Sequence, residues 1–69
     1  MSDAGGFLIV DPSAFTVEQV GQLLERSDKH GGWRHPDKVR WIIPVVHPKY
    51  ARDEWLRGGW PEDSVEIAS

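Results

Sequence analysis

The side chains of this chain that are best suited to bind a transition metal are those of its three histidines. His30, His35 and His47 are separated by five and twelve positions, and the chain contains no cysteine. Zinc sites combine cysteine and histidine ligands at short spacings along a loop or one helical turn apart. The spacing therefore predicts no metal site. From the surrounding sequence, His30 is expected near a helix end, and the other two histidines in turns before proline.

Nucleophilic catalysis and phosphate binding each require a characteristic local sequence, which the chain lacks. Ser13, Ser27 and Ser64 all lie outside a Gly-x-Ser-x-Gly context. The three Gly-Gly pairs precede a predicted strand or follow predicted helices, whereas a phosphate-binding loop follows a strand and opens a helix. We therefore expect a protein that is not an enzyme and that binds no cofactor.

The charged residues are unevenly distributed along the chain, whose formal net charge is −3. All eight Lys and Arg residues lie within 26–57, beside four acidic residues, so this segment carries +4. The segment before it carries −4 and the segment after it −3. The basic middle is either neutralised by the acidic ends in the folded protein or presents a face to an anionic partner.

Four tryptophans in 69 residues are the second unusual feature of the composition. Trp41 lies on an apolar strand face and Trp55 on an apolar helix stripe, so both are expected in the core. Trp33 and Trp60 each follow Gly-Gly, and they either fold over the core or stay exposed for recognition. Exposed aromatic residues beside arginine are typical of protein-interface hot spots and also of single-stranded nucleic-acid sites. The residues expected to contact a partner are Trp33, Arg34, Lys38, Arg52, Arg57 and Trp60.

The elements that must position these residues follow from apolar periodicity and turn signals. A chain of 69 residues forms one small domain, in which a deep pocket is hard to build, and residues 1–6 are expected to be frayed. A capping box at Thr16 and Gln19 opens the clearest helix, in which Gly21 is expected to allow close approach to the sheet. The predicted elements are a strand at 7–10, a helix at 16–29, a loop at 33–37, a strand at 38–46, a helix at 48–57 and a strand at 64–67.

This order, β-α-β-α-β, predicts an α+β fold in which two helices pack on one face of a small three-stranded sheet. The strand at 7–10 is apolar on both faces, which favours an interior position. Pro44 has no N–H to donate to a ladder, which favours an edge position or a bulge for the strand that contains it. Arg40 is expected to pair with Glu66 across strands.

Two segments resemble a DNA-binding family. Residues 15–24, FTVEQVGQLL, resemble the opening helix of excisionase-type and related winged helix-turn-helix proteins. Residues 50–61, which contain EWLRGGWP, are similar to their recognition helix and the turn into the wing. The resemblance implies DNA binding, although in that family the two helices are close in sequence, and here the apolar stretch 38–46 separates them.

We expect a non-enzymatic module that binds another protein and acts by occluding a surface of its partner. Its size and composition suit a phage or mobile-element accessory protein, such as a host-factor inhibitor or a virion component. The alternative is nucleic-acid binding through the basic segment 26–57, in an excisionase-like manner. Homo-oligomerisation through an edge strand is a third possibility. The absence of cysteine favours a reducing, cytoplasmic location, and no apolar run approaches the length of a membrane span.

Overall fold

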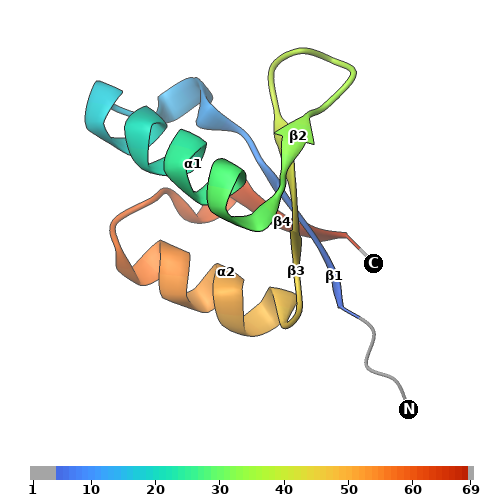
Figure 1. Cartoon of the computed structure of the whole chain (residues 1–69). Coiled ribbons are helices and arrows are strands. Elements are labelled where there is room, and N and C mark those ends of the chain that lie inside the picture. Colours follow the sequence, from blue (N-terminus) through green and yellow to red (C-terminus); the bar gives the residue numbers. More distant parts are fainter. Residues whose placement is uncertain (1–4, 69) are drawn as a thin grey trace.

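The computed structural model describes residues 5–68, so most of the segment expected to be frayed, residues 1–4, lies outside the described residues. Two helices stand beside a sheet of four strands (Figure 1). The elements are β1 (Gly6–Val10), α1 (Val17–His30), β2 (Trp33–Arg34), β3 (Trp41–Val45), α2 (Pro48–Arg57) and β4 (Val65–Ala68), with 3-10 turns at Pro12–Ala14 and Glu62–Ser64. Within this range, neither helix has the length and apolar character needed to cross a bilayer.

The sheet is antiparallel, with the strand order β2-β3-β1-β4. In its register, Val10 of β1 lies opposite Trp41 of β3 and Val65 of β4. The element order is β-α-β-β-α-β, which with this strand order is the split βαβ, or ferredoxin-like, arrangement. The predicted α+β class and the interior position of the first strand are confirmed, but the prediction of three strands in β-α-β-α-β order is wrong.

The additional strand is β2, in the segment predicted to be a loop. Trp33 and Arg34 pair with Ile42 and Trp41, and they form a hairpin with β3. Asp37 holds the connecting loop in shape, because its Oδ1 accepts hydrogen bonds from the backbone N–H groups of Val39 and Arg40. A strand of two residues is too short to show a period of two, so no apolar alternation marks it in the sequence.

The first helix begins at the predicted capping box. Thr16 Oγ1 accepts a hydrogen bond from the backbone N–H of Gln19, and Gln19 Oε1 accepts one from the backbone N–H of Thr16. Gly31, at φ 74°, closes the other end in the left-handed conformation. The predicted helices at 16–29 and 48–57 therefore agree with α1 and α2 to within one residue.

Both helices cover the same face of the sheet, and the core lies between these two layers (Figure 1). On β1 and in the middle of β3, the side chains that face the helices are buried, whereas their neighbours along each strand are half-buried or exposed. Towards the edges this burial is lost, because Trp41 is half-buried and Ile67 of β4 is exposed. The buried hydrophobic residues are Leu8, Val10, Leu23, Ile43, Val45, Trp55, Trp60 and Val65. The expectation that helices cover one face is thus confirmed.

Pro44 does not mark an edge strand, because β3 lies between β2 and β1. The pairing of β3 with β2 ends at Ile42, so Pro44 lies beyond the reach of β2. Among residues 5–68, no strand on that side requires an N–H from Pro44, and this explains how a proline fits in an interior strand.

The two helices do not form the helix-turn-helix that the excisionase resemblance implies. The hairpin of β2 and β3 separates α1 from α2 along the chain, and both helices pack on the sheet. The stretch that departs from the family pattern is therefore the strand β3, at the middle of the fold.

Candidate functional site

The face of the sheet opposite the helices is apolar and carries two neighbouring aromatic rings. Residues directly opposite each other on paired strands share a face, so Trp33 lies on the same face as Ile42, and Phe7 on the same face as Pro44. The rings of Phe7 and Trp33 meet edge to face, with centroids 5.9 Å apart and an interplanar angle of 73°. We call this surface the open sheet face; its residues are Phe7, Ile9, Trp33, Ile42, Pro44, Glu66 and Ala68.

The two aromatic side chains of the open sheet face remain accessible despite their mutual contact. Trp33 is 47% exposed and Phe7 is 38% exposed. Within residues 5–68, both helices lie on the other side of the sheet, so neither covers these rings (Figure 1). A contiguous apolar surface of this kind, with an acidic residue at its margin, is typical of an interaction site.

The β2–β3 hairpin brings together three of the residues expected to contact a partner, but it points them in different directions. Trp33 faces the open sheet face, whereas Arg34 lies opposite Trp41 on the helix side. The guanidinium carbon of Arg34 lies 5.2 Å from the centroid of the Trp41 ring, which is a cation–π contact. Lys38 is exposed at the tip of the hairpin, where its φ is 64°. Only Trp33 of this group therefore belongs to the apolar surface.

Arg40 pairs with Asp37 rather than with Glu66, so the expected cross-strand pair is not formed. The Nε of Arg40 lies 2.7 Å from Oδ2 of Asp37. Hydrogen bonds from the backbone N–H groups of Arg40 and Val39, followed by the Arg40 side chain, hold the pKa of Asp37 well below its usual range. The hydrogen bond between the Arg40 and Asp37 side chains is the main cause of a raised pKa for Arg40, and Glu66 contributes only through its charge. This cluster fixes the hairpin loop beside the open sheet face.

Trp60 and Arg52 have structural positions, although both were expected to contact a partner. Trp60 is only 4% exposed and packs against Phe15 and Trp55, with ring centroids 4.7 and 5.6 Å away. Arg52 donates from Nε to the carbonyl of Val65 at 2.9 Å, and from Nη2 to the carbonyl of Glu62 at 3.2 Å. Of the two possibilities left open for Trp60, the structure shows the core position.

The six expected contact residues do not form one surface. Arg57 ends α2, at the end of the domain away from the β2–β3 hairpin (Figure 1). Lys38 lies in that hairpin, so the segment 26–57 contributes its exposed cations to separate regions. The accessible pair of Trp33 and Phe7 remains as the core of a candidate site. Phe7 was missed because its apolar run indicated only a buried strand.

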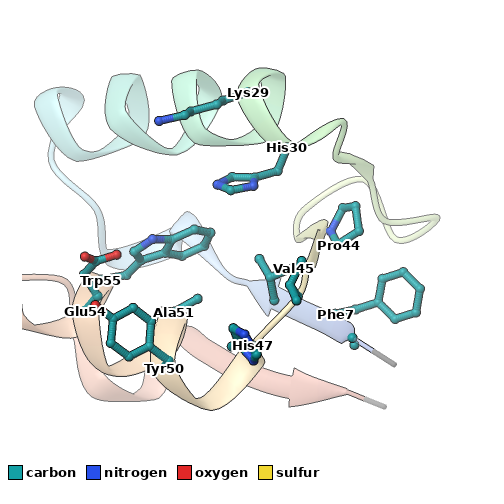
Figure 2. A pocket seen from close by; sticks show the side chains of 13 residues that line it. Phe7, Lys29, His30, Pro44, Val45, His47, Tyr50, Ala51, Glu54 and Trp55 are labelled. Carbon is teal, nitrogen blue, oxygen red and sulfur yellow. The ribbon is translucent and has the colours of Figure 1, made fainter. Parts of the chain in front are cut away.

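A concave surface lies between the two helices, and sequence reasoning missed it entirely. This inter-helix groove has a volume of about 780 Å³ (Figure 2). Its floor is apolar and consists of Val45, Ala51 and Trp55; Lys29 and His30 come from α1, and Tyr50 and Glu54 from α2. The other lining residues are Gly5, Gly6, Phe7, Pro44, Val46 and His47. Four separate chain segments form it, so no local sequence pattern could indicate it.

Two of the three histidines line the groove, and the third lies elsewhere. His30 and His47 line the inter-helix groove, whereas His35 lies in the hairpin, where its Nδ1 accepts a hydrogen bond from the backbone N–H of Asp37 at 3.1 Å. In the part of the chain that the structure describes, no three His, Asp or Glu side chains are grouped as metal ligands. The three histidines therefore do not gather in one place.

Known proteins do not add to this description. The chain was compared with protein-family models, with curated proteins and with solved structures, and none of the three comparisons found a significant match. The split βαβ arrangement supports many unrelated functions, so it does not select one of them. The functional reading of this chain follows from its own two surfaces, the open sheet face and the inter-helix groove.

Proposed function

We propose that this protein is a non-enzymatic binding module that uses its open sheet face to bind another protein. The observation that carries this proposal is the accessible edge-to-face pair of Phe7 and Trp33 on the side of the sheet away from the helices. Ile9, Ile42 and Pro44 extend the apolar surface around the two rings. An exposed tryptophan packed beside other apolar side chains is a typical anchor of a protein interface.

The position of the basic side chains favours a protein partner over a nucleic acid. Binding to nucleic acid requires several cations along one surface, because they must replace the counterions of the phosphates. Here half of the eight Lys and Arg residues have intramolecular contacts: Arg26 with Trp55 and Trp60, Arg34 with Trp41, Arg40 with Asp37, and Arg52 with Val65 and Glu62. Glu66 is an acidic residue of the open sheet face, and it would repel phosphates; Arg40, which borders the same face, is paired with Asp37.

The mechanism that suits this surface is occlusion of an apolar region on the partner. Trp33 and Phe7 would insert between apolar side chains of the partner, and the surrounding strand residues would exclude water from the contact. The sheet holds Phe7, and the hairpin with its Asp37 hydrogen bonds holds Trp33, so little order has to be gained on binding.

The test is capture of the partner by wild-type protein and by matched variants. Trp33→Ala is expected to weaken binding at least about tenfold, as truncation of an interface anchor does. Tyr50→Ala is the control, because Tyr50 is 68% exposed and lies on α2. Cross-linking through p-benzoylphenylalanine placed at position 33, and not at position 50, should yield the same partner. Equal capture by the two alanine variants would refute a role for the open sheet face.

Two further measurements separate this function from its alternatives. Light scattering that shows a doubled mass, abolished by Trp33→Ala, would identify the partner as a second copy of the chain. Anisotropy titrations with duplex and single-stranded DNA at low salt should show no micromolar binding. Binding that weakens steeply with added salt would instead support the nucleic-acid alternative.

A further inference from the structure

The space between the helices is filled at only one of its ends. Near Phe15 and Trp60, aromatic rings occupy it, and the guanidinium carbon of Arg26 lies 4.8 Å from the Trp60 ring centroid. Towards the start of α2, the small side chain of Ala51 takes the corresponding place beside Val45, and the inter-helix groove remains. One side of the Trp55 ring system therefore borders the filled end, and the other side borders the groove.

We propose that the inter-helix groove binds a small amphipathic carboxylate, meaning a molecule with an apolar chain or ring and one carboxylate group. The floor of Val45, Ala51 and Trp55 would receive the apolar part. The groove volume of about 780 Å³ lies within the range of small-molecule sites, roughly 300–1,000 Å³. This site is separate from the open sheet face, with which it shares only Phe7 and Pro44 at its margin.

Three basic side chains of the groove lining carry nitrogen donors that suit a carboxylate, whereas one side chain carries a carboxylate that suits an amine. Lys29 and His30 are consecutive residues at the end of α1, and His47 precedes α2. In Figure 2, His30 projects from α1 into the space above the floor, and Lys29 lies beside it on the same helix. Glu54, on α2, is the single acidic side chain of the lining.

The two sides of the groove do not neutralise each other. Among residues 5–68, no ion pair within 4.0 Å joins Lys29 to Glu54 or to another acidic side chain. A carboxylate placed beside α1 would therefore meet a cation that has no competing ion pair, and it would lie away from the acidic side of the groove. An apolar body then extends over Ala51 towards Trp55.

An NMR titration of the full chain with three eight-carbon compounds tests this site. Sodium octanoate is expected to shift backbone amide signals of residues 29–30, 45–47 and 50–55. The alcohol 1-octanol should bind more weakly, and octylammonium chloride most weakly, because it would approach Lys29 with a like charge. Amide shifts spread evenly over the chain, or octylammonium binding as tightly as octanoate, would overturn the assignment.

A pair of charge reversals supplies the matched control. Lys29→Glu should raise the Kd for octanoate by about three- to tenfold, whereas Lys49→Glu, which makes the same change of net charge outside the groove lining, should leave it nearly unchanged. Equal effects of the two reversals would assign the binding to overall charge and refute the site. Ala51→Phe should block binding by filling the floor, with its amide spectrum confirming the fold. Trp33→Ala should leave octanoate binding unchanged, so the groove and the open sheet face can fail independently.

Discussion

The indole N–H of Trp60 donates a hydrogen bond to Oε1 of Gln22 at 3.1 Å, and so ties the loop after α2 to the middle of α1. The ring of Trp60 is almost fully buried between Phe15 and Trp55. One side chain thus joins the end of α2 to the start and the middle of α1, about forty residues earlier in the chain. The other tryptophan that follows Gly-Gly, Trp33, has no comparable role in the core.

Replacing these two tryptophans should therefore have opposite consequences. Trp60→Ala is expected to cost about 3–5 kcal/mol, because it leaves a large cavity in the core. A chain of this length has a free energy of unfolding of about 3–10 kcal/mol, so the variant should be largely unfolded near 37 °C. Trp33→Ala should change stability by less than about 1 kcal/mol. Urea unfolding followed by circular dichroism measures both, and a stable Trp60→Ala protein would contradict the core position.

Two glycines form a second contrasting pair. Gly21 was expected to allow close approach of its helix to the sheet, but among the described residues no heavy atom outside its own helical turn lies within 4 Å of where its Cβ would be. Gly21→Ala should therefore stabilise the protein by about 0.5–1 kcal/mol, the helix-propensity difference. At Gly32, a Cβ would lie 2.8 Å from the Ile42 carbonyl oxygen and 2.7 Å from Ser27 Oγ.

Gly32→Ala should accordingly destabilise the protein by about 1–3 kcal/mol, as overpacking does. Thermal unfolding of both glycine variants under identical conditions gives the comparison. A lower midpoint for Gly21→Ala than for the wild type would show that the chain does pack closely against residue 21. An unchanged midpoint for Gly32→Ala would contradict the close contact of residue 32 with Ile42 and Ser27.

Asp37 predicts how stability depends on acid. Its pKa is lowered in the folded protein by hydrogen bonds from the backbone of Arg40 and Val39 and from the Arg40 side chain. The charged form is therefore stabilised by folding, and this contribution is fully present above the unfolded pKa of about 4 and is lost as the pH falls through the folded pKa. The Asp37→Asn variant should therefore lose less stability than the wild type as the pH falls below about 4. Titration of the Asp37 carboxyl carbon by NMR should give a pKa below its usual range; a normal value would contradict the loop geometry.

Arg52 should contribute to stability through the end of the sheet. Its side chain donates to the carbonyls of Val65 and Glu62, which joins α2 to the start of β4. Arg52→Met should cost about 1–2 kcal/mol and speed amide exchange in residues 65–68, since two hydrogen bonds are lost. Arg57→Met is the control, because within the described chain Arg57 is exposed at the end of α2, and its change should stay within about 0.5 kcal/mol. Similar exchange rates in the two variants would argue against the tie to β4.

The elements predicted well from sequence are those whose signal is local. The capping box at Thr16 and the apolar runs around Ile9 and Ile43 each depend on a few neighbouring residues, and the structure contains an element at each. β2 was missed because Trp33 and Arg34 become a strand only through pairing with β3. Local propensity carries no information about such a partner.

The candidate site was predicted less completely, for a related reason. Trp33 was identified by its type and its position after Gly-Gly, and the structure places it on an accessible surface. Its neighbour Phe7 comes from a strand far away in sequence, and β3 lies between the strands that carry them. Trp60 shares the sequence context of Trp33 but has a core position, because burial depends on which elements meet around a side chain.

The strand order has a consequence for how the chain folds during synthesis. β1 pairs only with β3 and β4, both of which follow it in the chain, and β4 lies at the far end. When β1 leaves the ribosome, both of its hydrogen-bonding edges are therefore without partners; β3 begins about thirty residues later, and β4 more than fifty residues later. Among the strand pairs, the β2–β3 hairpin alone has a short connection, so folding should be slow for a domain of this size, and the nascent chain should be most prone to aggregation before β4 emerges.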